Sequence, residues 1–247
     1  MYVRATIAYD GTDFFGFQWQ TGTRTVQGAV EAALAEVAQA ATRVIGSGRT
    51  DTGVHALGQV IGFQVVWRHS LADLQRALNA VLPDDVAVLD LAAAAEGWHP
   101  RFSARRRHYR YTVLNVPLRS PLDRRYSHQV AQRLDLAALN QAAALLVGTH
   151  DFASFGRPTQ GESTTRTIFS AGWQKHGDRL VFDVVGNAFL RSMVRSLVGS
   201  QLQVGLGTWS LERLAAVLDS RDRALAAPPA PACGLCLIGV DYDDDMR

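Results

Sequence analysis

The sequence contains very little cysteine and no long apolar run. Its two cysteines, Cys233 and Cys236, form a single C-x-x-C pair in 247 residues. A structural zinc site needs about four ligands and a disulfide scaffold needs several cysteine pairs, so the sequence predicts neither. There is no apolar stretch of about 18 residues and no apolar signal core after Met1, so we expect a cytoplasmic protein without a membrane span.

Lysine is also nearly absent, since Lys175 is the only lysine among 25 basic residues. Arginine makes forked contacts with phosphate and stacks on bases, which suits a nucleic-acid partner. A coding bias toward arginine explains the same composition equally well. The formal net charge of +2 adds little evidence for a polyanionic partner. Local clusters of arginine are therefore more informative than their total number.

Hydrophobic periodicity predicts the same order of elements twice, β-α-β-β-α-β. In residues 1–104 the elements are expected at 2–9, 25–40, 43–47, 57–66, 71–82 and 86–93. Residues 105–247 repeat the order with one added helix, at 107–116, 134–147, 163–174, 179–186, 189–204, from 210, and at 235–243. Thr25, Ser70 and Ser210 are expected to cap helices. We therefore expect an α+β protein of two ferredoxin-like halves, with a mixed, largely antiparallel sheet, helices on one face and a central cleft.

The segment GSGRTDTGVHALGQV, residues 46–60, is the most unusual stretch of the chain. Its glycines and threonines suit neither a helix nor a strand, and they let the backbone bend sharply and a ligand approach closely. We expect a loop that presents Asp51 between two strands. If the side chain of Arg49 meets Asp51, it favours the charged carboxylate, which can act as a base or a nucleophile. A purely structural Asx turn is the competing interpretation.

Two other kinds of catalytic site fit this segment less well. No second acidic residue occurs within twenty residues after Asp51, which disfavours the paired carboxylates of a glycosidase. Asp51 and His55 lack the further histidines of a common metal site, which disfavours metal-assisted hydrolysis.

A second informative segment is HPRFSARRRHYRYTVLN, residues 99–115, in which arginines crowd together with two tyrosines. In an extended chain, Arg105, Arg107, Tyr109 and Tyr111 would share one face. Phosphate-binding side chains beside a stacking platform are what unstacked RNA bases require. Arg110 and, nearer the N-terminus, Arg24 are further candidates for RNA binding. A solvated basic edge strand with its tyrosines packed inward is the alternative.

Two further segments carry weaker signals. In GNAFLRSMVRSLVGS, residues 186–200, the apolar positions 189, 193 and 197 predict one core face of a helix, with Arg191 and Arg195 on a neighbouring face. Of these two arginines, Arg195 is the candidate to reach into a cleft and pair with a carboxylate. In the segment DGTDFFGFQWQ, residues 10–20, one short loop cannot bury four aromatic side chains, which predicts an interface or an RNA contact.

At these residues the sequence resembles the tRNA pseudouridine synthase A family. YDGTDFFGFQWQ, RTVQG, GRTDTGVHA, LNAVLPDDV, RFSARRRHYRY, GTHDFASF, GNAFLRSMVRS and GLCLIGVDY resemble family motifs in the expected order and span nearly the whole chain. The resemblance implies a pseudouridine synthase fold and modification of uridines 38 to 40 in the anticodon stem-loop of tRNA. It also implies a homodimer that needs neither metal nor cofactor.

The resemblance also implies roles for single residues. Asp51 matches the essential aspartate, and Tyr109 matches the tyrosine that stacks on the target base. Arg49 is similar to the arginine that helps hold the base out of the stack, and Arg195 to the arginine that pairs with the aspartate. Leu235 and Leu237 resemble the leucines that flank the site.

The chain departs from the family pattern at three positions, Thr52, Ser196 and Cys236, none of which has a proposed chemical role. Because of Thr52 and Cys236, the sequence predicts the activity of the enzyme but not its rate or its selectivity. A non-catalytic RNA-binding protein with two RRM-like sheets is the main alternative, although it would not need the GRTD sequence. A metal-assisted RNA hydrolase is the third interpretation.

Overall fold

The computed structural model of the protein describes residues 1–158 and 161–243. The chain divides into two compact units: unit 1 joins residues 1–105 to the segment that starts at Cys236, and unit 2 comprises Arg106–Leu235. The first boundary lies one residue from the expected division between 104 and 105. The last segment differs from expectation, because the strand β10 (Leu235–Asp241) is paired in parallel with β3 of unit 1.

Unit 1 has the predicted order of elements, β-α-β-β-α-β, to which β10 is added. The elements are β1 (Tyr2–Tyr9), α1 (Val26–Ala38), β2 (Ile45–Gly46), β3 (His55–Gln64), α2 (Leu71–Val81) and β4 (Val86–Ala93). The strands lie in the order β4-β1-β3-β10, and β2 pairs with β3. All of these pairs except β10–β3 are antiparallel.

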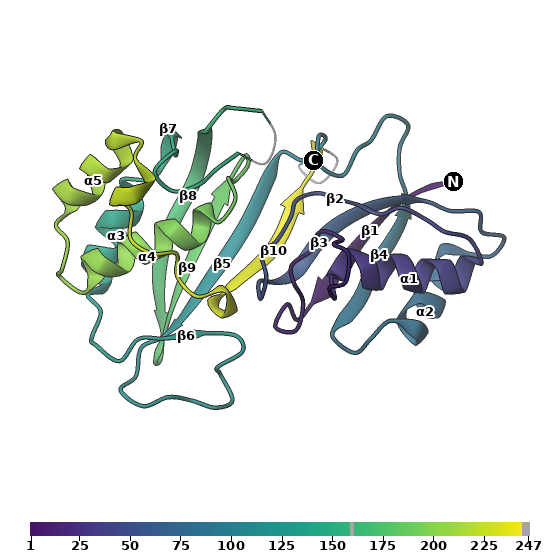
Figure 1. Ribbon diagram of the computed structural model, residues 1–247, viewed down its shortest axis with the longest axis horizontal. Coiled ribbons are helices and arrows are strands. Elements are labelled where there is room, and N and C mark those ends of the chain that lie inside the picture. The colour runs from purple at the N-terminus through teal and green to yellow at the C-terminus, as the bar shows by residue number, and fades with distance from the viewer. Residues whose placement is uncertain (159–160, 244–247) are drawn as a thin grey trace. The chain divides into compact units, whose positions relative to one another are not determined.

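Local sequence explains why unit 1 forms these elements. Every second residue of β1 is buried, as expected for a strand with one face covered. Figure 1 shows α1 and α2 side by side against this sheet. The side chain of Thr25 accepts a hydrogen bond from the Gly28 N–H at the start of α1, and Ser70 forms a capping box with Asp73 at the start of α2. Both predicted caps are therefore confirmed.

Unit 2 also combines helices with a mainly antiparallel sheet. Its elements are β5 (Arg106–Leu114), β6 (His128–Gln129), α3 (Leu136–Ala144), β7 (Gly148–Asp151), β8 (Thr165–His176), β9 (Arg179–Gly186), α4 (Met193–Gly205) and α5 (Leu211–Ser220), followed by the short 3-10 turns Arg223–Leu225 and Ala232–Gly234. The strands lie in the order β5-β9-β8-β7, and β6 pairs in parallel with β5. The short strands β6 and β7 were not predicted, whereas Ser210 caps α5 as expected.

The start of α4 differs from the prediction of a helix from residue 189. Ser192 has a φ of 59°, in the left-handed region, so the regular helix begins only at Met193. Phe189 and Arg191 therefore precede the helix, and Arg191 forms an isolated β-bridge with Arg157. Met193 and Leu197 are fully buried as predicted. Arg191 and Arg195 consequently do not share a helical face.

Among residues 1–158 and 161–243, the helices are all too short or too polar to span a bilayer. Cys233 and Cys236 are partly buried, and no disulfide joins them. The Sγ of Cys233 lies 3.4 Å from the Ser127 carbonyl oxygen, and burial raises the pKa of the Cys233 thiol. Within the described residues, no group of three His, Cys, Asp or Glu side chains has the arrangement of a metal site.

Candidate functional site

Asp51 lies in the loop of residues 47–54 that connects β2 with β3 in unit 1. We call this segment the aspartate loop. The side chain of Asp51 is half-buried, Arg49 is exposed, and Thr50 between them is buried. The sequence-based expectation that a glycine-rich loop presents Asp51 between two strands is therefore confirmed for this unit.

The aspartate loop is held by the segment that connects β1 with α1, residues 10–25, which we call the aromatic loop. The Phe17 N–H donates to the Thr50 carbonyl at 3.1 Å, and the Gly53 N–H donates to the Phe14 carbonyl at 3.3 Å. The Val54 N–H closes the turn onto the Asp51 carbonyl at 3.1 Å. Because these bonds lie on both sides of Asp51, they fix the backbone from which its carboxylate projects.

Two glycines allow this close approach of the two loops. Gly11 has no room for a side chain, because a Cβ would lie 2.0 Å from the Val54 carbonyl oxygen. Gly16 has a φ of 84°, and a Cβ there would lie 2.8 Å from the Thr50 carbonyl oxygen. Both positions therefore require glycine for steric reasons.

Buried polar side chains also connect each loop to a neighbouring strand, the aromatic loop to β3 and the aspartate loop to β1. The Gly11 N–H donates to Nδ1 of His55 at 3.0 Å, and the Asp10 carboxylate lies 3.1 Å from the same nitrogen. The hydroxyl groups of Tyr9 and Thr50 are hydrogen-bonded at 2.8 Å. Sequence reasoning did not identify Tyr9 or Gln59 as site residues. The feature of the sequence that could have identified Gln59 is its polar side chain inside the apolar run LGQVIGFQVV.

In unit 2, Tyr109 lies on β5 and is partly buried. Its ring packs edge-on against Phe189, with centroids 5.2 Å apart and an interplanar angle of 84°. This contact restrains the orientation of the tyrosine ring. Phe189 lies in the segment that precedes α4.

Tyr111 does not belong to an exposed stacking platform, contrary to the expectation that Arg105, Arg107, Tyr109 and Tyr111 form one. Tyr111 is fully buried, its hydroxyl donates to the Pro231 carbonyl at 2.8 Å, and burial raises its pKa. Alternation along β5 places Tyr111 on the core face with Val113, and burial increases along the strand.

The candidate RNA-binding arginines all have intramolecular partners. Arg24 makes a bidentate ion pair with Asp85, and Arg105 makes one with Asp243. Arg107 donates to the Asn187 carbonyl at 2.6 Å. The two carboxylates reduce the net positive charge that Arg24 and Arg105 offer to phosphate, although both arginines remain substantially exposed.

Arg110 belongs to a small ionic cluster on β5 and β9 of unit 2. Its guanidinium makes two hydrogen bonds to Asp183, at 3.0 and 3.2 Å. Nε2 of His108 lies 2.7 Å from the same carboxylate. Burial alone would raise the pKa of Asp183, but the hydrogen bonds from Arg110 and His108 outweigh burial and lower the pKa.

The remaining residues suggested by the resemblance lie on α4 and β10. Arg195 lies in the first turn of α4 of unit 2, and its Nε donates to the Ala230 carbonyl at 2.7 Å. Leu235 and Leu237 are buried in β10. Within unit 1, Leu237 is paired with Ala56 and Cys236 with His55, which places them next to the start of β3.

The aromatic loop is only partly exposed. Phe14 and Phe17 are buried, whereas Phe15 is 56% and Trp19 is 46% exposed. The prediction that this loop cannot bury all four aromatic rings is therefore confirmed. The guanidinium of Arg24 lies 4.0 Å from the centroid of the Phe14 ring.

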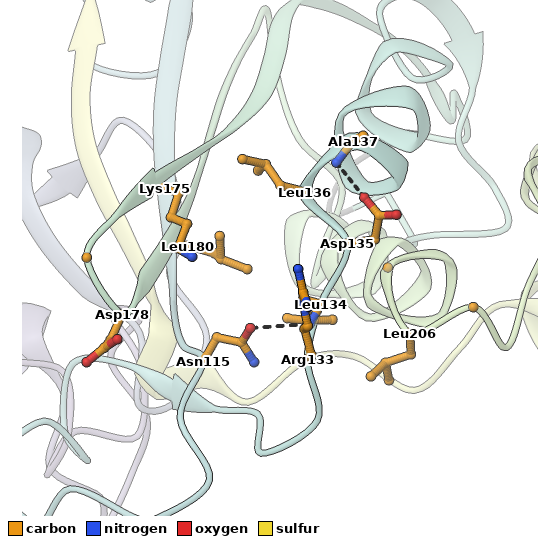
Figure 2. A pocket seen from close by; sticks show the side chains of 13 residues that line it. Asn115, Arg133, Leu134, Asp135, Leu136, Ala137, Lys175, Asp178, Leu180 and Leu206 are labelled. Atoms are coloured by element: carbon orange, nitrogen blue, oxygen red, sulfur yellow. Dashed lines mark hydrogen bonds between the residues drawn. The ribbon is translucent and has the colours of Figure 1, made fainter.

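A hollow of about 610 Å³ lies in unit 2, between the start of α3 and the β8–β9 turn (Figure 2). Two of its polar side chains maintain local structure. Asn115 Oδ1 accepts from the Leu134 N–H, and Asp135 Oδ1 accepts from the Ala137 N–H. The residues that line this hollow include none of the candidate site residues. We therefore assign the candidate chemistry to the aspartate loop rather than to this hollow.

The comparisons with known proteins point to one class of enzyme. A family model described as tRNA pseudouridine synthase matches residues 5–103 and 142–243. The match includes both the aromatic loop and the aspartate loop of unit 1, and α4 of unit 2. The class that the fold and the aspartate loop define is therefore that of the pseudouridine synthases.

Curated relatives narrow the class to one family. A protein of Roseiflexus castenholzii is 47% identical over 97% of this chain and 90% of its own length. Proteins of Chloroflexus aurantiacus and of a Geobacillus species are 46% and 43% identical, over 96% and 98% of this chain and 87% and 98% of their own lengths. All three are named tRNA pseudouridine synthase A. The chain belongs to the tRNA pseudouridine synthase A family.

The contact between the two loops can be tested at glycine. Gly16 and Gly22 both have positive φ angles, 84° and 73°, but a Cβ at Gly22 meets nothing within 4 Å. Alanine at either position costs about 1–2 kcal/mol of backbone strain. Gly16→Ala additionally clashes with the Thr50 carbonyl. We expect Gly16→Ala to lower the free energy of unfolding more than Gly22→Ala and to speed hydrogen exchange at the Gly53 amide. Equal effects of the two variants in urea unfolding and in exchange would contradict this account.

Proposed function

We propose that this protein isomerises uridine to pseudouridine in the anticodon stem-loop of tRNA, at positions 38 to 40, with Asp51 as the catalytic carboxylate. The main observation behind the proposal is that the chain is a tRNA pseudouridine synthase A family member with a GRTD segment. Hydrogen bonds to the aromatic loop hold the loop that contains this segment and presents Asp51. The proposal includes no metal and no cofactor.

The reaction sets two physical requirements. The bond between N1 of uracil and C1′ of ribose breaks, the base rotates, and a bond between C5 and C1′ forms, while the proton leaves C5 and N1 gains one. A base that is paired and stacked in a stem does not expose these atoms. The nucleotide must therefore be flipped out, at a cost of about a few kcal/mol.

Asp51 is suited to the chemical step because a half-buried carboxylate on a restrained backbone loses little freedom on reaching its target. The carboxylate either attacks a carbon of the sugar or base, or removes a proton. Both routes use the same side chain, so its removal stops either of them.

The roles of the other residues belong to the same proposal. Tyr109 stacks on the detached uracil and retains it, supported by the restraint of its ring by Phe189. Arg49 precedes Asp51 by two residues, is exposed, and helps hold the flipped base. Four arginines contact the phosphates of the RNA: Arg24, Arg105, Arg107 and Arg110. Such contacts position the RNA without reading its sequence. Arg195, Leu235 and Leu237 complete the site in the manner that the resemblance implies.

We also propose that the protein is a homodimer of the cytoplasm, where its tRNA substrate is found. The exposed Phe15 and Trp19 support a macromolecular contact on the aromatic loop. Sedimentation equilibrium should give twice the chain mass of 26.9 kDa. A monomer mass across the micromolar range, or recovery with membranes on cell fractionation, would contradict these two assignments.

The main test of the proposed function is removal of the Asp51 carboxylate. Asp51→Ala should reduce tritium release from C5-labelled tRNA below detection, because no other group replaces the carboxylate, while tRNA binding persists. Asp90→Ala is a matched control, since Asp90 is an exposed aspartate on β4 of the same unit. Asp90→Ala should keep wild-type turnover.

The same assay separates the proposal from its alternatives. A non-catalytic RNA-binding protein would bind tRNA without releasing tritium. A metal-assisted hydrolase would shorten the RNA and stop after addition of a chelator. Normal turnover by Asp51→Ala would refute the role given to the aspartate loop.

A further prediction concerns stacking at Tyr109, measured in the Asp51→Ala background so that binding is not complicated by turnover. Tyr109→Phe keeps an aromatic face and should bind tRNA like its parent. Tyr109→Leu loses that face and should bind about 1–3 kcal/mol more weakly, the usual value of base–aromatic stacking. If leucine and phenylalanine give the same affinity in filter-binding titrations, Tyr109 is not the stacking residue.

A further inference from the structure

Gln59 is a fully buried polar residue in an apolar strand. It lies on β3, opposite Ile7 of β1, and its exposed fraction is 0%. Placing an amide in a core is unfavourable unless its hydrogen bonds are replaced. An apolar side chain would fill this position at no such cost, so the contacts of the amide group explain why it is there.

The amide of Gln59 bonds directly to the first part of the aspartate loop. Its Oε1 accepts a hydrogen bond from the Ser47 hydroxyl at 2.7 Å. Its Nε2 donates to the Gly48 carbonyl at 3.1 Å and lies 3.5 Å from the Tyr9 hydroxyl. One group acts as donor and acceptor at the same time, which an aliphatic or thioether side chain cannot do.

Tyr9 extends these contacts to the residue that precedes Asp51. The Tyr9 hydroxyl is hydrogen-bonded to Thr50 Oγ1 at 2.8 Å. Ser47, Thr50 and Tyr9 are exposed by only 1%, 6% and 4%. In such a water-excluded setting hydrogen bonds are stronger and mutually dependent. The backbone from Ser47 to Thr50 is thus tied to β1 and β3 immediately before the carboxylate.

We propose that Gln59 is a positioning residue for Asp51, which acts through the Ser47–Thr50 backbone together with Tyr9. This inference rests on the proposed catalytic role of Asp51. A reacting group must be held within about 0.5 Å of its productive position. A displacement of about 1 Å caused by a change away from the reacting atoms can slow the reaction about 100-fold.

Unit 2 contains a matched control for this residue. Gln201 on α4 also has an exposed fraction of 0%. Its Oε1 accepts from Trp173 Nε1 at 2.9 Å, and its Nε2 donates to the Leu197 carbonyl at 3.2 Å. Gln59 and Gln201 are therefore equally buried and similarly bonded, but the bonds of Gln201 go to a core tryptophan and to its own helix.

The experiment compares Gln59→Met with Gln201→Met, because methionine preserves the unbranched shape and removes both bonding groups. Both variants should lower the thermal midpoint. In steady-state tritium release, at a temperature where both are folded, we expect Gln59→Met to lower kcat about 100-fold with little change in KM for tRNA. We expect Gln201→Met to retain both parameters. Equal loss of kcat in the two variants, or a Gln59→Met defect confined to KM, would overturn the inference.

Tyr9→Phe provides a second variant that removes one hydroxyl and keeps the ring in the core. It should lower kcat in the same direction, by about tenfold, and its effect should not multiply with that of Gln59→Met, because the two side chains act on one network. Full multiplication of the two effects, or wild-type kcat in Tyr9→Phe, would contradict the shared role.

The outcomes also separate this inference from the proposed function. Loss of turnover in Asp51→Ala with wild-type kcat in Gln59→Met would leave the function standing and refute the positioning role. Normal turnover in Asp51→Ala, or no tritium release by the unmodified protein, would refute the function and the inference together.

Discussion

The contact between the aromatic loop and the aspartate loop is the constraint on which the candidate site depends. Backbone hydrogen bonds join the aromatic loop to residues on both sides of Asp51. At Gly11 and Gly16 there is no space for a side chain between the loops. A short glycine-rich connection has many conformations in isolation, and selecting one of them costs entropy. The hydrogen bonds between the two backbones and those of the buried hydroxyl and amide groups offset that cost. The backbone of Asp51, and hence its carboxylate, therefore has a defined position.

The buried polar side chains of unit 1 are concentrated around the two loops. In the described part of this unit, the buried polar side chains are Thr25, Gln27, Ser47, Thr50, His55 and Gln59. They all lie in, or are hydrogen-bonded to, one of the two loops or the start of α1. Satisfied polar networks specify one arrangement of a core more strictly than apolar packing does. We interpret this concentration of polar groups as the support of the loop that carries Asp51.

Most of the arginines proposed to bind RNA already have anionic partners within the protein. Arg24, Arg105 and Arg110 are each fixed by a carboxylate in the free protein. Such pairs are worth little at an exposed position, because water and salt screen them. Breaking each pair therefore costs little free energy, and contact with a phosphate would exchange one anion for another.

The sequence alone determined the order of elements in unit 1, the helix caps at Thr25, Ser70 and Ser210, and the loop that carries Asp51, because these depend on local periodicity, capping side chains and glycine content. Only the tertiary structure decided that α4 begins at Met193, that Tyr111 is a core residue and Tyr109 is not, and that β10 joins unit 1. It also revealed the contacts of Gln59 and Tyr9 with the aspartate loop. These features depend on pairing between residues far apart in the chain, and no local pattern records which distant partner each residue meets.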